Sequence, residues 1–113
     1  MEMNVIGRHR LLAVRLSGDI DHHSAHSIST EIDREFMRRG VRNLAIDFSG
    51  TGFMDSSGIG LIMGRCKKVA AIGGKLFVYG MNSSIKRMLN MCGMEKIIIM
   101  ADTADDIMEV LYR

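Results

Sequence analysis

The stretch NLAIDFSGTGFMDSSGIGLIMGRCKKVAAIGGKLFVY, residues 43–79, decides the fold. It opens with a short apolar run at 43–48, passes through a polar loop at 49–55, and then places apolar residues at helical spacing. A glycine pair ends that stripe, and a second apolar run follows at 75–79. Two short apolar runs separated by one helical stripe predict a strand, a helix and a parallel strand joined by a right-handed crossover.

The same alternation of strands and helices continues on both sides of this stretch. Its further members, in chain order, are strands at 4–7 and 10–17, a helix from 24 that stops at Gly40, a helix capped at 82–83 and stopped at Gly93, a strand at 97–99 and a helix capped at 102–103. The two opening strands form a hairpin, which makes the sheet mixed. Residues 1–113 are therefore predicted to form one α/β domain with about five strands in a mostly parallel sheet and about four helices packed on it.

Two polar loops, at 18–23 and 49–55, leave the ends of predicted strands and lead into helices. In sheets built from crossovers, loops at the carboxyl ends of the strands form the usual functional edge. We therefore expect the two loops to lie side by side. The second loop runs into FMDSSGIG, residues 53–60, which holds an acid, two hydroxyls and two glycines at the start of a helix.

Composition and charge argue against several classes of function. The 113 residues are 47% apolar and carry a formal net charge of +2, so no strong field favours nucleic acid or an anionic membrane. No signal peptide is visible at the start and no apolar run reaches transmembrane length, which predicts a cytoplasmic protein. Cys66 and Cys92 lie in apolar helical patterns, so we expect both to be buried, reduced thiols.

A serine at a strand-to-helix turn raises the hypothesis of a hydrolase. The nucleophile elbow of hydrolases needs a glycine two residues before the serine, but Met54 and Asp55 stand at those places before the two serines. The histidines of the other loop and of the helical turn after it, His22, His23 and His26, are candidate bases. Because the elbow signature fails, a hydrolytic site stays a minor alternative.

The two loops are also candidates for a phosphate-binding loop, a divalent metal site or a helix cap. No lysine follows Gly58 or Gly60 at the spacing of a phosphate-binding loop, and Asp21 with Asp55 lacks a third ligand for a divalent metal. A helix cap at Asp55 or Ser56 explains one hydroxyl. It does not explain a second hydroxyl, nor two glycines in a first turn, where each costs up to about 1 kcal/mol relative to Ala. A small, exposed surface at a helix start is what a protein partner or an active site would use.

The residues of both loops also carry a family resemblance. GDIDHHSA at 18–25, FMDSSGIG at 53–60 and the pair Gly64 with Arg65 together resemble the anti-sigma factor antagonists of the STAS-domain class, closest to those of sporulation. The match runs essentially from end to end of the chain. It implies a STAS-like fold and a protein-binding module switched by phosphorylation, rather than an enzyme.

The resemblance also implies which residues act. Ser56 would be the serine phosphorylated by the partner, an anti-sigma factor that is itself a serine kinase, and Asp21 would lie at the partner interface. The unmodified form would bind the anti-sigma factor and release the sigma factor, whereas the phosphorylated form would not bind. The full set of expected partner-binding residues is Asp21, His22, His23, Asp55, Ser56, Ser57, Gly58 and Gly60.

The resemblance also implies which proteins act on this one, and it leaves two alternative functions open. A PP2C-type serine phosphatase would remove the phosphate, the free protein would be a monomer, and it would need no cofactor, metal, nucleic acid or membrane. One alternative within the family is a stress-response or stressosome-type regulator. Another, outside it, is a small nucleotide-binding or hydrolytic domain that uses Asp21, His22 and Ser56.

Overall fold

Five strands form one sheet whose order in space follows their order in the chain, in the computed structural model, which describes residues 1–111. β1 pairs antiparallel with β2, and all later neighbours pair in parallel. The strands are β1 (Glu2–Ile6), β2 (Leu11–Ser17), β3 (Asn43–Gly50), β4 (Leu76–Tyr79) and β5 (Ile99–Met100). The predicted mixed, mostly parallel sheet is confirmed.

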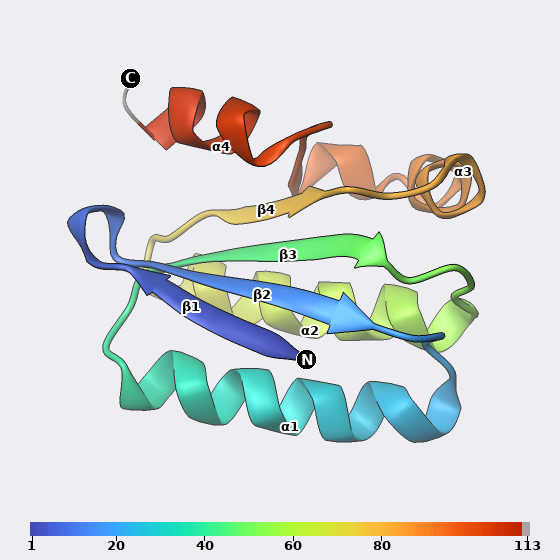
Figure 1. Cartoon of the computed structure of the whole chain (residues 1–113), viewed down its shortest axis with the longest axis horizontal. Helices are drawn as coiled ribbons and strands as arrows, with labels where there is room; N and C mark the ends of the chain where they lie inside the picture. Colours follow the sequence, from blue (N-terminus) through green and yellow to red (C-terminus); the bar gives the residue numbers. More distant parts are fainter. Residues whose placement is uncertain (112–113) are drawn as a thin grey trace.

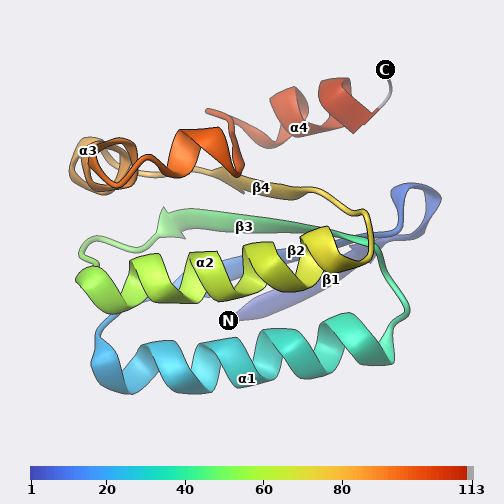
Figure 2. The same ribbon diagram turned by 180° about the vertical axis from the view of Figure 1, so that it is seen from behind.

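Helices connect the parallel strands and cover the sheet unequally. They are α1 (His22–Arg38), α2 (Ser56–Ala71), α3 (Ser83–Met91) and α4 (Ala104–Leu111), with 3-10 turns η1 (Gly7–His9) and η2 (Met94–Lys96). Figure 1 shows α1 and α2 running side by side, and Figure 2 shows α2 in front of the sheet. In both views the two helices start at one end of the sheet and finish at the other.

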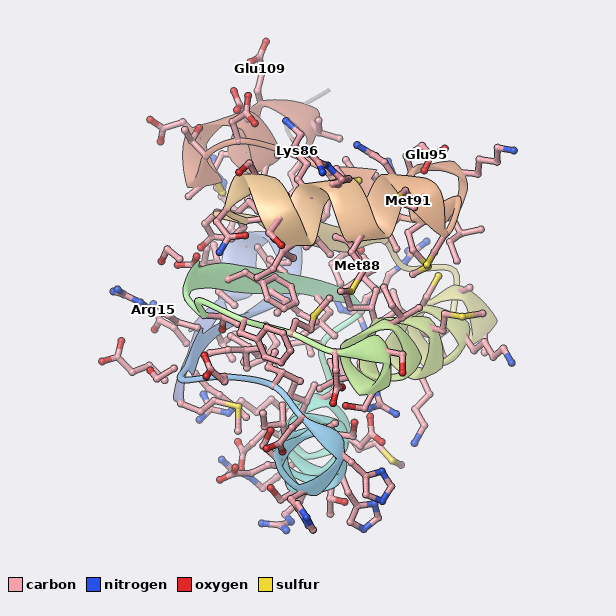
Figure 3. The ribbon with its side chains drawn as sticks, turned by 90° about the vertical axis from the view of Figure 1, so that its right-hand side faces the viewer. Arg15, Lys86, Met88, Met91, Glu95 and Glu109 are labelled. Atoms are coloured by element: carbon pink, nitrogen blue, oxygen red, sulfur yellow. The ribbon has the colours of Figure 1, made fainter. Side chains whose placement is uncertain are left out.

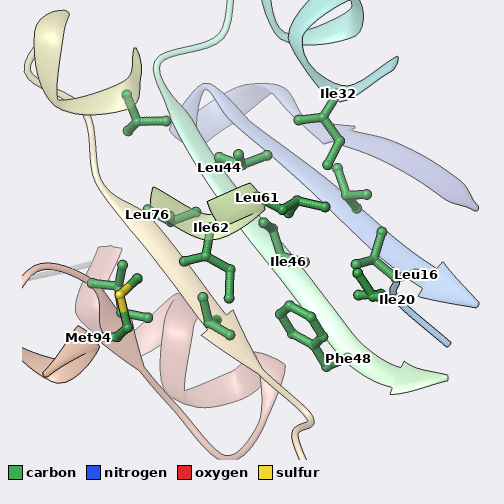
Figure 4. Close-up of a cluster of buried hydrophobic side chains, with 14 of the residues drawn as sticks. Leu16, Ile20, Ile32, Leu44, Ile46, Phe48, Leu61, Ile62, Leu76 and Met94 are labelled. Carbon is green, nitrogen blue, oxygen red and sulfur yellow. The ribbon is translucent and has the colours of Figure 1, made fainter. Parts of the chain in front are cut away.

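Alternation along the strands divides the core between the two faces of the sheet. Leu44, Ile46 and Phe48 of β3 point to the face that packs against Ile32 of α1 and Ile62 of α2 (Figure 4). Each of the five is at most 1% exposed, and burying such a side chain contributes about 1.5–3 kcal/mol. This larger cluster holds α1 and α2 against the sheet.

The opposite face of the sheet carries a smaller cluster under α4. Leu11, Ala45 and Phe77 point to this face and pack with Ile107 of α4. Strand residues one position apart thus belong to different clusters, as the two-residue period of a strand requires. None of the helices within residues 1–111 is both long enough and apolar enough to span a membrane.

The last strand differs from its prediction. The apolar run at 97–99 was expected to be extended, but the strand is Ile99–Met100. The turn η2 (Met94–Lys96) ends at Ile97, whose N–H donates to the carbonyl of Met94, and Ile97 is 51% exposed. Ile97 therefore belongs to a hydrogen-bonded turn, and the strand starts only after it, at Ile99.

The expectation of two buried thiols is wrong for Cys92. α3 ends at Met91, so Cys92 becomes the residue that follows the helix, and it is exposed. Cys66 lies on α2 and is half-buried, with its Sγ donating to the carbonyl of Ile97 at 3.3 Å. Both cysteines are free, as predicted.

Candidate functional site

The two polar loops lie side by side, as predicted. Ile20 and Met54 form a parallel bridge between them. The N–H of Ile20 donates to the carbonyl of Phe53 at 3.0 Å, and the N–H of Asp55 donates to the carbonyl of Ile20 at 3.1 Å. Ile20 and Met54 are each 1% exposed, so the bridge is anchored in the core. The starts of α1 and α2 are thereby held next to each other.

Asp21 caps α1, which begins at His22 rather than at the predicted Ser24. Its carboxylate accepts a 2.9 Å hydrogen bond from the N–H of Ser24, and the Ser24 hydroxyl accepts one of 3.0 Å from the N–H of Asp21. This reciprocal pair is a capping box. The hydrogen bond from the Ser24 N–H is the main reason that the pKa of the Asp21 carboxyl is lowered, so Asp21 presents a negative charge to solvent.

Asp55 caps α2, which settles the choice between Asp55 and Ser56 as the cap. One carboxylate oxygen of Asp55 accepts a 2.8 Å hydrogen bond from the N–H of Ser57. The same oxygen accepts a very short hydrogen bond from the Ser57 hydroxyl. Both polar groups of Ser57 are therefore directed toward the cap, and Ser57 is half-buried.

Ser56 is the first residue of α2 and is exposed. Within residues 1–111 its hydroxyl has no hydrogen-bond partner, in contrast with that of Ser57. It lies at the positive end of the α2 macrodipole, where negative charge is stabilised. The two adjacent serines, which look alike in the sequence, thus differ in availability to a reagent or an enzyme.

The two glycines of the first turn of α2 have different roles. A Cβ at Gly58 would overlap the buried side chain of Met54, so this glycine allows the helix to approach the loop before it. A Cβ at Gly60 would meet nothing within 4 Å. Gly58 is buried and Gly60 is exposed. Of the two, Gly60 is the one that offers surface to a partner.

The histidines do not complete a hydrolytic site with the serines. His22 and His23 lie on the first turn of α1, are exposed, and contact each other edge to face with ring centroids 5.9 Å apart. No hydrogen bond joins either ring to Ser56 or Ser57 in the part of the chain that the structure describes. Among those residues there is also no group of three His, Cys, Asp or Glu side chains placed to hold a metal ion.

Two further residues at this edge were not singled out as site residues from the sequence. Phe53, in the second loop, is 57% exposed, although its ring is large and apolar. Asn82, predicted only as a helix cap, donates from its side-chain amide to the carbonyl of Gly52 at 2.9 Å. This bond ties the start of α3 to the same loop.

Figure 3 views this end of the molecule. In this view Met88 lies on the side of α3 that faces α2.

Comparison with known proteins gives a consistent result. The family model of the STAS domain matches residues 2–107. An anti-sigma F factor antagonist from Paenibacillus polymyxa is 38% identical over 92 residues, which cover 81% of this chain and 79% of that protein. An anti-sigma-B factor antagonist from Listeria monocytogenes is 25% identical over 83 residues, covering 74% and 72%.

A solved structure supports the same assignment at the level of the fold. The Bacillus cell fate determinant SpoIIAA in its phosphorylated form superposes with a TM-score of 0.74, at 25% identity, over 96% of this chain and 97% of that one. The motifs of the two loops, the mixed sheet and the match to the family model all indicate the same family. The chain therefore belongs to the STAS-domain family of anti-sigma factor antagonists.

Proposed function

We propose that this protein is a switch controlled by phosphorylation of Ser56. The unphosphorylated form binds an anti-sigma factor that is a serine kinase and so releases the sigma factor, and the phosphorylated form does not bind. The observation that carries the proposal is the exposed Ser56 hydroxyl at the start of α2, beside the loop of Asp21. The phosphorylated form of the structural relative SpoIIAA supports it.

The hydrogen bonds at the start of α2 favour Ser56 over Ser57 as the phosphorylated residue. A kinase must bring the hydroxyl oxygen in line with the transferred phosphoryl group. The Ser57 hydroxyl would first have to break its hydrogen bond to the Asp55 carboxylate. Ser56 is exposed and needs no such rearrangement.

Phosphorylation is proposed to act on the interface rather than on the fold. A phosphate adds roughly −1.5 to −2 charges, which takes the formal +2 of the chain close to zero. At a helix N-terminus the macrodipole tolerates this charge, so α2 persists. In a complex the same dianion, next to the Asp55 carboxylate, would lose water and repel an acidic or apolar partner surface.

The loop of Asp21 is proposed to form the second half of the partner surface. Asp21 is exposed and charged, and its position is fixed by the capping box and by the bridge at Ile20. His22 and His23 extend the surface along the first turn of α1, and Asp55, Ser57 and Gly60 extend it around Ser56. Gly58, which was also expected to contact the partner, contributes by packing, because it is buried against Met54.

The proposed pathway is the control of sporulation transcription. The relative that acts on an anti-sigma F factor is 38% identical, whereas the anti-sigma-B factor antagonist is 25% identical, so a stress-response role is the second candidate. We further propose that a PP2C-type serine phosphatase restores the active form, and that the free protein is a cytoplasmic monomer.

Mapping of the phosphorylated residue tests this function. The protein is incubated with ATP and the cognate anti-sigma factor, and intact mass and peptide fragmentation are measured for the natural sequence, Ser56→Ala and Ser57→Ala. We expect one phosphate on Ser56, none in Ser56→Ala and one in Ser57→Ala. Phosphate on Ser57, or on no residue of the chain, would contradict the proposal.

A further inference from the structure

A groove lies at the end of the molecule opposite to the serine loops. It is formed where α1 and α2 finish, on the left in Figure 1, whereas the two loops lie on the right. Its cavity volume is about 620 Å³, within the range of small-molecule sites. Among the residues that line it are Phe36, Met37, Val41, Ile72, Arg10 and Arg42.

The walls of the groove are apolar and partly exposed. Phe36 and Val41 are buried, with exposed fractions of 8% and 5%. Ala71 adds a small apolar side chain to the wall. Met37 is 81% exposed and Ile72 is 52% exposed. Large apolar side chains held open to water around a concave surface mark a binding site more often than scattered ones do.

The charges of the groove are separated along its length. At one end Asp33 forms ion pairs with Lys68 at 2.7 Å and with Arg65 at 2.9 Å, so both cations there have an acidic partner. The other end lies past the last residue of α1, Arg38, at Gly40, whose carbonyl accepts a hydrogen bond from Arg10. At that end stand two arginines, Arg10 and Arg42.

The two arginines are positioned by the backbone and have no acidic partner. Arg10 donates to the carbonyl of Gly40 at 3.3 Å, and Arg42 donates twice to the carbonyl of Gly73, at 3.1 and 2.7 Å. Within residues 1–111 neither guanidinium forms an ion pair. The groove therefore has an apolar body, one end whose cations are paired with Asp33, and another end with two guanidinium groups that have no acidic partner.

Arg10 is held in its place by an uncommon backbone conformation. Its φ is 51°, in the left-handed region that residues other than glycine rarely adopt. The Arg10 carbonyl accepts hydrogen bonds of 2.9 Å from the N–H groups of Arg42 and Asn43. The segments that carry both guanidinium groups are thus bonded to each other at the edge of the groove.

We propose that this groove binds an aliphatic carboxylate, with the carboxylate at Arg10 and Arg42 and the chain along Met37, Val41 and Ile72. A guanidinium group matches a carboxylate in geometry and charge. The apolar walls exclude a small inorganic anion as the main ligand, and the two uncompensated charges disfavour a neutral or cationic one. The site is separate from the serine loops and needs no protein partner.

The test uses decanoate as the probe, below its micelle concentration, with decanol and decylammonium as matched neutral and cationic probes. Amide chemical shifts of the isotope-labelled protein are followed during titration. We expect saturable binding of one decanoate, with shifts concentrated at residues 36–42 and 68–73. Decanol should bind more weakly, and decylammonium should not bind.

Two exposed methionines supply a matched pair of variants. Met37→Glu places a negative charge on the groove wall and should weaken decanoate binding at least about tenfold, or 1.4 kcal/mol. Met91→Glu alters a methionine of the same 81% exposure on α3 and should leave the affinity unchanged. Arg10→Gln should weaken decanoate binding but not decanol binding.

Several outcomes would overturn the proposal. They are the absence of saturable decanoate binding, equal affinities for decanoate and decanol, equal losses in Met37→Glu and Met91→Glu, and shifts centred on the serine loops. Because Met37 and Met91 are exposed, both variants should keep the natural fold, which their unperturbed spectra will verify. A change of molecular mass on addition of decanoate would instead assign the groove to contacts between copies of the chain.

Discussion

The N–H of Asp55 donates a 3.1 Å hydrogen bond to the carbonyl of Ile20 and so joins the starts of two helices. Asp21 follows Ile20, and Ser56 follows Asp55, so the charged cap of α1 and the exposed hydroxyl of α2 are each one residue from this bond. A single partner surface can therefore cover both residues. The arrangement gives a reason why the two motifs belong together although they are far apart in the sequence.

The cap of α2 predicts a contrast between two substitutions of Asp55. Asp55→Ala removes the acceptor for the Ser57 N–H and should destabilise the protein by about 1 kcal/mol, whereas Asp55→Asn keeps an acceptor and should cost much less. Urea unfolding at neutral pH measures both. Equal losses in the two variants would mean that the charge of Asp55, rather than the cap, stabilises α2.

The packing at Gly58 predicts opposite effects for two alanine substitutions in the same turn. Gly58→Ala forces the buried Met54 side chain to move and should cost about 1–3 kcal/mol. Gly60→Ala meets open space on a helix and should stabilise the protein by up to about 1 kcal/mol. Thermal and urea unfolding measure the change in stability of both variants. A stable Gly58→Ala variant would show that the loop before α2 adapts easily.

A substitution at Gly60 also provides a test in which stability and partner binding should change in opposite directions. Gly60 lies one turn after Ser56 and is exposed, so a methyl group there should weaken binding of the anti-sigma factor while the fold gains stability. Gly64→Ala, one turn further along α2, also meets open space and serves as the control. Calorimetric titration with the partner should show a loss for Gly60→Ala and a smaller one for Gly64→Ala. Unchanged binding for both would move the interface away from this face of α2.

The end of α1 predicts a pH dependence. Hydrogen bonds from Arg38 and then Arg39 to Glu35 lower the pKa of this carboxyl from 4.5 to about 2. Because the pKa is lower in the folded state, the stabilisation is fully present above pH 4.5 and is lost as the pH falls toward 2. The small stability difference between the natural protein and Glu35→Gln should therefore vanish in that window.

A second acidic residue on α1 provides the control for this pH dependence. Glu31 is exposed and forms no ion pair within the described residues, so Glu31→Gln should not show the same convergence. Urea unfolding at pH 6, 4 and 2.5 compares the three proteins. A Glu35→Gln difference that persists undiminished at pH 2.5 would mean that the ion pairs with Arg38 and Arg39 do not cause it.

The elements and the adjacency of the loops could be predicted because they depend on local patterns and on one rule of topology. The helical spacing of apolar residues predicts α1 and α2. Because crossovers make β2 and β3 parallel, their carboxyl ends lie at one edge of the sheet, where the two loops meet at Ile20 and Met54. Helix boundaries were less exact. Asp21 and Ser24 exchange hydrogen bonds, so α1 begins at His22, a detail that periodicity does not contain.

Other features could not be predicted because they depend on side-chain geometry or on packing between distant segments. The difference between Ser56 and Ser57 arises from the direction of one hydroxyl toward Asp55. The exposure of Cys92 follows from the helix end at Met91. The groove between the ends of α1 and α2 exists only once the two helices pack, and no motif marks it.

We expect a phosphate on Ser56 to abolish partner binding without unfolding the protein. The most direct test is calorimetric titration of the anti-sigma factor with the unmodified and the fully Ser56-phosphorylated protein, together with an amide spectrum of each. We expect the affinity to fall about 10⁴-fold, the amount that converts a largely bound population into a free one, while shifts stay confined to the two loops. Equal affinity of the two forms, or a spectrum of an unfolded chain after phosphorylation, would contradict the claim.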